Sequence, residues 1–135
     1  MHKIPDGFKL ISSISPFADL IGPVYQKQTG SEIVFGLRAS DKHCNSRGLL
    51  HGGVLSTLAD FALGYTLAYA ASPPTAMATA SLTIDYAESA QNGDWIEVKT
   101  DVQKIGRNLA FANCYCFVDA RRIARASAVF AVVAV

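Results

Sequence analysis

The chain has 135 residues, of which 50% are hydrophobic, and its twelve lysines and arginines balance eleven aspartates and glutamates. This length fits one domain spanning residues 1–135, and so apolar a composition excludes a disordered chain. A net charge of +1 argues against a nucleic-acid-binding protein, which would hold phosphates with a surplus of cations. The apolar surplus also predicts an oligomer, in which part of the apolar surface is buried against a second copy.

The first twenty residues are expected to form an irregular lead-in with one short helix around Phe8–Ser13. Met1–Pro16 is charged and has no apolar core, so it does not resemble a signal peptide. The longest apolar run, Phe61–Ala71, is too short to cross a bilayer. Because the three cysteines cannot all pair within one chain, we expect a reducing, cytoplasmic setting without a membrane.

The middle of the chain reads as two strands and a helix. The strands are predicted at Pro23–Gln28 and Glu32–Ala39, joined by a turn at Thr29–Ser31. A polar loop then leads to a helix from Val54 to about Ala71, which two prolines terminate. Apolar residues occupy nearly every face of this helix, which is typical of a helix at the centre of a structure.

After the helix the pattern changes to a period of two, which predicts strands. Four are expected: Met77–Tyr86, Trp95–Lys104, Leu109–Val118 and Ile123–Val135. Consecutive strands with short turns predict an antiparallel meander. The fold class is therefore α+β, with an antiparallel sheet wrapped around one long central apolar helix. A second copy of the chain is the simplest cover for the remaining helix face.

Asp60 is the only side chain between Leu58 and Leu67 that is charged at neutral pH. Burying an unpaired carboxylate costs several kcal/mol, so this position needs an explanation. One interpretation is an Asp near the helix edge, or one satisfied by a neighbouring hydroxyl such as Ser56 or Thr57. The other is a functional carboxylate.

The helix begins at His51-Gly52-Gly53. Two glycines allow another group to approach the backbone, and the unpaired N–H groups of a first turn hold negative charge, including a developing oxyanion. A flexible turn is the alternative interpretation. The combination with Asn45 before it and Asp60 after it favours a site.

These residues resemble one family. The motifs that carry the resemblance are Asn45, Leu50-His51-Gly52-Gly53, Leu58-Ala59-Asp60 and Thr83-Ile84-Asp85-Tyr86. They are similar to the hotdog-fold acyl-CoA thioesterases of the phenylacetate-degradation (PaaI-like) type, and also to small mammalian acyl-CoA thioesterases. The resemblance runs from about Pro16 to Val135 and implies the hotdog fold.

The resemblance also implies a role for each site residue. The Gly52 N–H would polarise the thioester carbonyl, Asn45 would be a second donor and His51 would orient that region. Asp60 would be the general base for water or a nucleophile, and Thr79 would position the water. A thioester has a good leaving group, so an oxyanion donor and one carboxylate could suffice without a general acid, a metal or a cofactor.

Other motifs are weaker. Cys114 and Cys116 lie on one face of a strand and are expected to be buried structural thiols. His2 and His43 are expected at the surface. Ser56 lacks the Gly-x-Ser-x-Gly context of a serine hydrolase, and no phosphate-binding glycine motif is present.

Several further residues are candidates for contacts with the substrate. Arg107 and the Arg121-Arg122 pair could contact coenzyme A phosphates, although solvated turn charges are the alternative. Glu88 lies where relatives often carry a proline or a basic residue, and its charge would not favour phosphates. The aromatic and sulfur side chains that could line an acyl pocket, or could simply be core, are Phe61, Tyr65, Tyr69 and Met77.

The predicted function is hydrolysis of acyl-CoA by a homodimer, or a dimer of dimers. Gly52 and Asp60 lie ~12 Å apart along the helix, too far to act on one thioester from one chain, so the partner chain would supply the carboxylate. The alternative is a non-catalytic acyl-CoA-binding hotdog module. A hotdog dehydratase is a third possibility, but it would need a histidine and an acid close together, and His51 and Asp60 are not placed for that.

Overall fold

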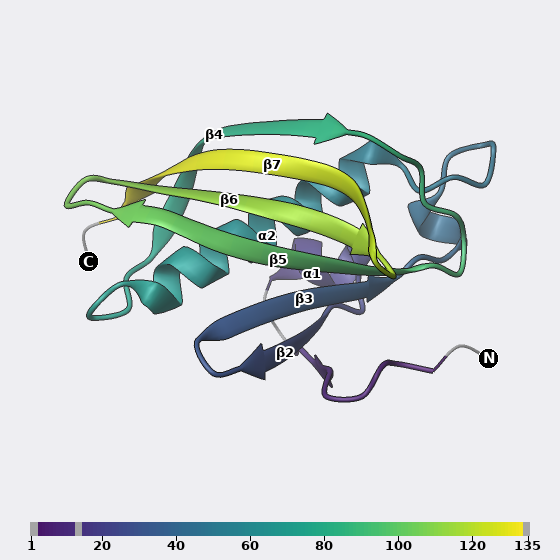
Figure 1. Ribbon diagram of the computed structural model, residues 1–135, viewed down its shortest axis with the longest axis horizontal. Helices are drawn as coiled ribbons and strands as arrows, with labels where there is room; N and C mark the ends of the chain where they lie inside the picture. The colour runs from purple at the N-terminus through teal and green to yellow at the C-terminus, as the bar shows by residue number, and fades with distance from the viewer. Residues whose placement is uncertain (1–2, 13–14, 134–135) are drawn as a thin grey trace.

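The computed structural model describes residues 3–12 and 15–133 and shows one antiparallel sheet curled around one long helix (Figure 1). The helices are α1 (Pro16–Ile21), α2 (Gly52–Ala70) and a 3-10 turn, η1 (Asp41–His43). The strands are β1 (Lys9–Leu10), β2 (Tyr25–Thr29), β3 (Glu32–Arg38), β4 (Met77–Tyr86), β5 (Trp95–Ile105), β6 (Leu109–Val118) and β7 (Arg121–Val132). They form one seven-stranded sheet in the order β1-β2-β3-β5-β6-β7-β4.

The core lies between α2 and the concave face of the sheet. Alternate residues of β5, β6 and β7 point inward and are buried against Leu58, Ala62 and Leu63 of α2, which have no exposed surface. The predicted α+β class and the central position of the apolar helix are confirmed. The strands predicted at Met77–Tyr86 and Leu109–Val118 have these bounds in the structure.

The helix predicted at Phe8–Ser13 is wrong within its described part. Lys9 and Leu10 instead form β1, which pairs with β2, and Ser13 lies outside the described residues. The helix of this region, α1, starts eight residues after the predicted Phe8, because the Ser15 side chain accepts the Ala18 N–H at 3.1 Å and a proline follows Ser15. A serine cap before a proline is a stronger helix start than anything in Phe8–Ser13.

The meander prediction is wrong for the first of the four strands. β5, β6 and β7 are sequential neighbours, but β4 pairs with β7 at the sheet edge, and β5 pairs with β3. The connection after β4 is held against the segment before α2, since Leu50 donates its N–H to the Ala90 carbonyl at 2.8 Å. This hydrogen bond holds the connection across the end of the sheet, from β4 at one edge to β5 beside β3. β4 and β5 are therefore not joined as a hairpin.

Several element boundaries differ from prediction by one to three residues. α2 starts at Gly52 rather than Val54 because His51 caps it, and its C-terminal end at Ala70 agrees with the expected stop before the prolines. β7 starts at Arg121, two residues before the predicted Ile123, and ends at Val132. The last two residues of the predicted strand, 134–135, lie outside the described residues, as does His2.

Candidate active site

The start of α2 is built on two histidines. The Nδ1 atom of His51 accepts the Gly53 N–H at 2.8 Å, and the His51 N–H donates to the His43 carbonyl at 2.8 Å. His43 was predicted at the surface but is buried, because its ring nitrogens have backbone partners in Ser40 and Ile21. A buried histidine with both nitrogens satisfied is a rigid support for the segment that carries Gly52.

Gly52 is the first residue of the helix, so its N–H has no partner within the helix. In the described part of the chain no other group accepts this N–H. The carbonyl of Gly52 accepts a hydrogen bond from the Tyr86 hydroxyl at 3.0 Å, and that hydroxyl lies 2.6 Å from Ser56 Oγ. A Cβ atom at Gly52 would lie 3.2 Å from the Tyr86 ring, so the close approach of Tyr86 favours glycine here.

Asn45 lies in the loop that runs back toward this helix start. Its side-chain oxygen accepts the N–H groups of Arg47, at 2.9 Å, and of Leu49, at 3.2 Å. The loop therefore uses the carbonyl end of the side chain and leaves the amide NH₂ as a donor. Asn45 can therefore stabilise the loop through its side-chain oxygen and donate a hydrogen bond to a ligand through its NH₂ group.

Asp60 lies two turns further along α2 and is half-buried. Its Oδ1 accepts a hydrogen bond from the Thr79 hydroxyl at 2.5 Å. Neither hydroxyl that offered the alternative explanation contacts it, since Ser56 bonds to Tyr86 and Thr57 donates to the Gly53 carbonyl at 2.9 Å. The carboxylate has one neutral donor and keeps its remaining acceptor positions for another group.

A β-bulge turns Thr79 toward Asp60. The register of β4 against β7 shifts between Thr79 and Ser81, so Ala80 has no paired residue. Thr79 pairs with the inward-facing Phe130, although regular alternation from Tyr86 would point residue 79 outward. The Thr79 prediction came from the family resemblance, and alternation alone would have placed its side chain on the wrong face.

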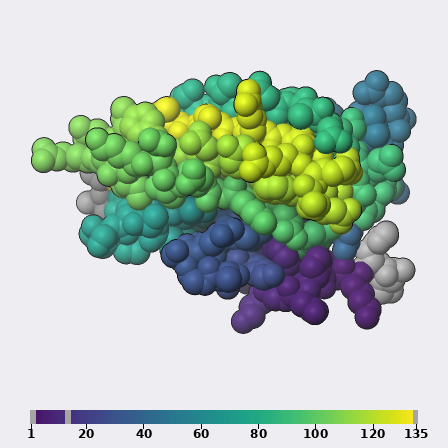
Figure 2. All heavy atoms as spheres, viewed as in Figure 1, coloured from purple at the N-terminus to yellow at the C-terminus, as the bar shows by residue number. Residues whose placement is uncertain are grey.

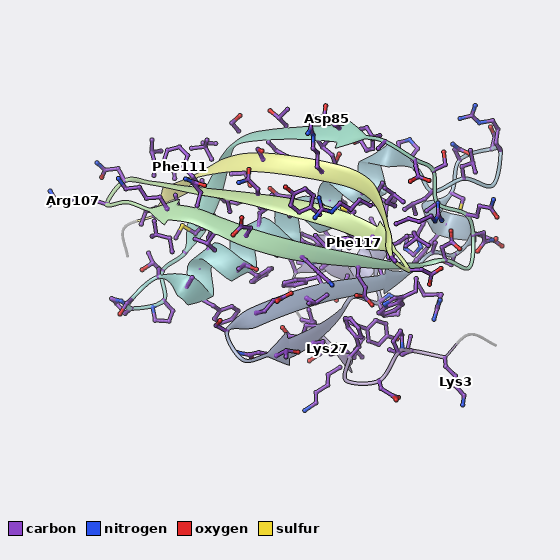
Figure 3. All side chains as sticks on the ribbon, in the orientation of Figure 1. Lys3, Lys27, Asp85, Arg107, Phe111 and Phe117 are labelled. Carbon is purple, nitrogen blue, oxygen red and sulfur yellow. The ribbon has the colours of Figure 1, made fainter. Side chains whose placement is uncertain are left out.

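The structure gathers the predicted residues into two groups and leaves one apart. His51 and Gly52 lie at the N-terminal end of α2, with Asn45 in the loop before it, and Asp60 and Thr79 lie two turns along the helix. Arg107 lies at the tip of the β5–β6 turn, at the opposite end of the sheet from the start of α2 (Figure 3). Within one chain, therefore, Arg107 and Gly52 do not meet.

The Thioesterase superfamily matches residues 47–132 of this sequence, a range that contains His51, Gly52, Asp60 and Thr79. Over 131 residues the chain is 44% identical to "Putative esterase PA0474" of Pseudomonas aeruginosa, covering 96% of this chain and 98% of that protein. The chain belongs to the thioesterase superfamily.

Solved structures agree with this assignment. Zebrafish thioesterase superfamily member 2 superposes with a TM-score of 0.81 and 26% identity, covering 89% of each chain. The Escherichia coli PaaI protein from the phenylacetic acid degradation operon superposes with a TM-score of 0.79 and 18% identity, covering 90% of this chain and 86% of that one. The predicted hotdog fold is confirmed, and the activity is that of a thioester or ester hydrolase.

Sequence reasoning missed Tyr86 and Ser56 as parts of this thioesterase site. Tyr86 was noted only as the end of a motif, and Ser56 was considered only as a nucleophile or as a hydroxyl partner of Asp60. The sequence did contain a signal for both residues. Ser56 follows Gly52 by one helical turn, and Tyr86 is the last of the inward-facing residues of β4. Only the antiparallel placement of β4 beside α2 brings the two hydroxyls together at Gly52.

The other candidates have structural partners in the thioesterase. Tyr65 stacks on Phe35 with ring centroids 6.2 Å apart, and burial raises the pKa of its hydroxyl. Cys114 and Cys116 are fully buried as predicted, and the neighbouring Cys116 thiol, with burial, raises the pKa of Cys114. None of the helices in the described residues is long and apolar enough to cross a membrane.

Proposed function

We propose that this thioesterase hydrolyses an acyl-coenzyme A thioester to a free acid and coenzyme A. One observation carries the proposal: a helix free of other charges presents an unpaired N–H at Gly52 and a half-buried carboxylate at Asp60. The first can stabilise an oxyanion and the second can activate water, which together meet the needs of thioester hydrolysis.

Each residue then has a role in the reaction. The Gly52 N–H and the Asn45 amide donate to the thioester oxygen as negative charge develops on it, and His51 orients the helix start. Asp60 takes a proton from water, the water oxygen bonds to the carbonyl carbon, and the tetrahedral intermediate expels the thiolate of coenzyme A to leave the free acid. In the alternative, Asp60 attacks the carbonyl carbon itself, the thiolate leaves, and water hydrolyses the resulting anhydride to the free acid and Asp60. Thr79 holds Asp60 by its hydroxyl and positions the water.

The distance between the two groups supports a site shared by two chains. Gly52 and Asp60 are eight positions apart, which is ~12 Å along a helix. A base must lie within about 3 Å of the water that it activates, and that water must lie beside the carbonyl. We infer that the Gly52 of one chain works with the Asp60 of its partner.

The exposure of strand β4 also supports a site shared by two chains. This strand is at the sheet edge, and none of its ten residues is buried. Its inward-facing Leu82 and Ile84 are only half-buried, whereas Ala126 and Phe130, which face inward on the adjacent strand, are 3% and 2% exposed. The chain's own helix thus leaves β4 undercovered, as expected where a second chain packs.

Pairing of two β4 strands about a two-fold axis would align the two groups. With full overlap of antiparallel strands, Met77 lies opposite the partner's Tyr86. The end of β4 that carries Thr79, which is bonded to Asp60 of α2, then lies against the partner's Gly52. The same axis brings the partner's Arg107 to the Gly52 end, where it could contact a substrate phosphate. Two such dimers would associate further in a dimer of dimers.

A single substitution tests the proposed activity. Asp60→Asn keeps the size of the side chain and removes the base, so turnover of acyl-CoA should fall by at least about a hundredfold while substrate still binds. Released thiol is measured with a panel of aromatic and straight-chain acyl-CoAs. Asp101→Asn, on the outer face of β5, is the control and should retain activity.

Two results would contradict the proposal. If Asp60→Asn hydrolyses acyl-CoA at the parental rate, Asp60 is not the base. If the parental protein binds acyl-CoA but releases no thiol from any member of the panel, the chain is the non-catalytic binding module that was the alternative.

A further inference from the structure

The proposed oxyanion donors lie on a segment at one end of the molecule. Figure 2 shows the loop that carries Asn45 as a blue lobe projecting at the upper right. This loop connects η1 to the start of α2, and Gly52 is the first helical residue after it. An N–H group stabilises an oxyanion only if it points at the developing charge. The backbone of this segment therefore needs a support from the rest of the protein.

His43, the last residue of η1, contacts the start of α2 through its backbone. Its carbonyl accepts the N–H of His51 at 2.8 Å, and the His51 ring accepts the N–H of Gly53 at 2.8 Å. Because His51 and Gly53 flank Gly52 in the sequence, these two hydrogen bonds hold the backbone on either side of the proposed donor. The direction of the Gly52 N–H therefore depends on where the His43 carbonyl lies.

The side chain of His43 is 2% exposed and uses both of its ring nitrogens. The backbone N–H of Ser40 donates to Nδ1 at 3.0 Å, so the hydrogen of the neutral ring is on Nε2. Nε2 donates this hydrogen to the carbonyl of Ile21. The bond to Ser40 lies within η1 and its cap, whereas the bond to Ile21 joins η1 to the C-terminal end of α1.

α1 is held near both of its ends. At its C-terminal end it accepts a second hydrogen bond from η1, since Lys42 Nζ donates to the Leu20 carbonyl at 3.3 Å. Near its N-terminal end, the Phe17 ring meets the Phe61 ring edge-on, with the ring centroids 6.3 Å apart. Phe61 lies on α2 next to Asp60. α1 and η1 together therefore support α2 at its start and again beside Asp60.

We propose that His43 is a positioning residue for the Gly52 N–H. Its ring fixes η1 against α1 through Ile21, and its carbonyl fixes the helix start through His51. Both ring nitrogens have partners inside the protein, so His43 acts through the backbone and not by exchanging protons with the substrate. This inference rests on the proposed function only in assigning an oxyanion to the Gly52 N–H.

Substitutions of His43 test the role by steady-state kinetics. His43→Leu removes both ring hydrogen bonds and keeps an apolar side chain in the buried position. On acyl-CoA its kcat should fall about tenfold with little change in KM, because the donor is misdirected in the transition state while the substrate-binding surfaces remain. His43→Gln should recover most of this loss, since the amide of glutamine can still donate to the Ile21 carbonyl.

Val98→Ala is the control for lost stability. Val98 is fully buried on β5, where its neighbours across the sheet are Phe35 and Cys116 rather than η1 or the start of α2. Its truncation leaves a cavity and should lower the melting temperature, as His43→Leu does, without changing kcat. Thermal unfolding compares the two variants. An equal fall of kcat in both would mean that any loss of stability slows the reaction, and the role of His43 would be abandoned.

Amide hydrogen exchange tests the positioning without using the activity. Mass spectrometry of peptides that span residues 49–55 should show exchange about tenfold faster in His43→Leu than in the parental protein, because the helix start has lost its support. Val98→Ala and His43→Gln should stay close to the parental rate in this segment.

The outcomes separate the positioning role from the activity. Parental exchange in His43→Leu, or parental kcat, would overturn the proposal for His43. If exchange is faster in His43→Leu but the parental protein releases no thiol from any acyl-CoA, His43 holds the helix start as proposed and only the proposed function fails.

Discussion

At the scale of single residues, the site depends on side chains that hold the backbone as much as on those that react. Gly52 can present its N–H because it starts the helix, but a glycine is free to adopt other conformations. The Tyr86 hydroxyl on its carbonyl and the His51 ring on the next N–H remove that freedom. Tyr86 is therefore a positioning residue for the proposed oxyanion donor.

Tyr86→Phe tests that role. The ring stays and the hydroxyl is lost, with its bonds to Gly52 and Ser56, so kcat should fall by about three- to tenfold with little change in KM. Ser56→Ala leaves the Tyr86–Gly52 bond in place and should cost less. A Tyr86→Phe enzyme with parental kcat, shown by steady-state kinetics on acyl-CoA, would make the hydroxyl irrelevant to the reaction.

The residues that the sequence predicted and the residues that it missed differ in kind. Asp60 and Gly52 stand out locally, because a lone carboxylate in an apolar helix and a glycine pair at a helix start are anomalies of residue type. Tyr86 and His43 are ordinary residues whose partners lie 34 and 22 positions away along the chain. Such long-range contacts leave no trace in local periodicity.

At the scale of elements, β4 determines how the two groups of site residues are held. Its first part bonds to Asp60 through Thr79 and its last residue bonds to Gly52 through Tyr86, so one strand fixes two points of α2. The bulge at Ala80 makes this possible by bringing Thr79 to the inner face. Neither the bulge nor the pairing of β4 with β7 could be predicted, since alternation and turn length describe only neighbours in sequence.

Thr79→Val tests the inward orientation of Thr79. The substitution conserves shape and removes the donor to Asp60, so kcat should fall about tenfold, and Thr79→Ser should restore most of it. Thr83→Val is the control on the same strand, because Thr83 pairs with the exposed Ser127 and faces away from α2. Equal losses in Thr79→Val and Thr83→Val would mean that the strand tolerates no valine, and the specific role of Thr79 would be abandoned.

At the scale of the whole molecule, the apolar composition and the undercovered strand have one explanation. A chain that is half hydrophobic leaves Leu109 at the sheet end and Tyr69 at the end of α2 exposed, at 44% and 63%. The chain also leaves the edge strand β4 without a neighbour on one side, and the proposed catalytic pair Gly52 and Asp60 lie ~12 Å apart along α2. Dimerisation through β4 would resolve the last two together, and the α+β class and apolar helix predicted from sequence already implied a second copy.

Complementation between two inactive variants tests the shared site most directly. Gly52→Pro removes the oxyanion N–H at a first helical position, where proline is tolerated, and Asp60→Asn removes the base. Each variant alone should be inactive as a homodimer. Because a Cβ atom at Gly52 approaches the Tyr86 ring to 3.2 Å, thermal unfolding must show that Gly52→Pro is folded.

The deciding measurement is the thiol released by an equal mixture of the two variants after joint unfolding and refolding. About half of the dimers should be mixed, and each mixed dimer has one intact site, so the account predicts about a quarter of parental activity. Parental chains refolded in the same way give the reference rate. No recovery in a mixture that native mass spectrometry shows to contain heterodimers would contradict the shared site, because each chain would then act alone.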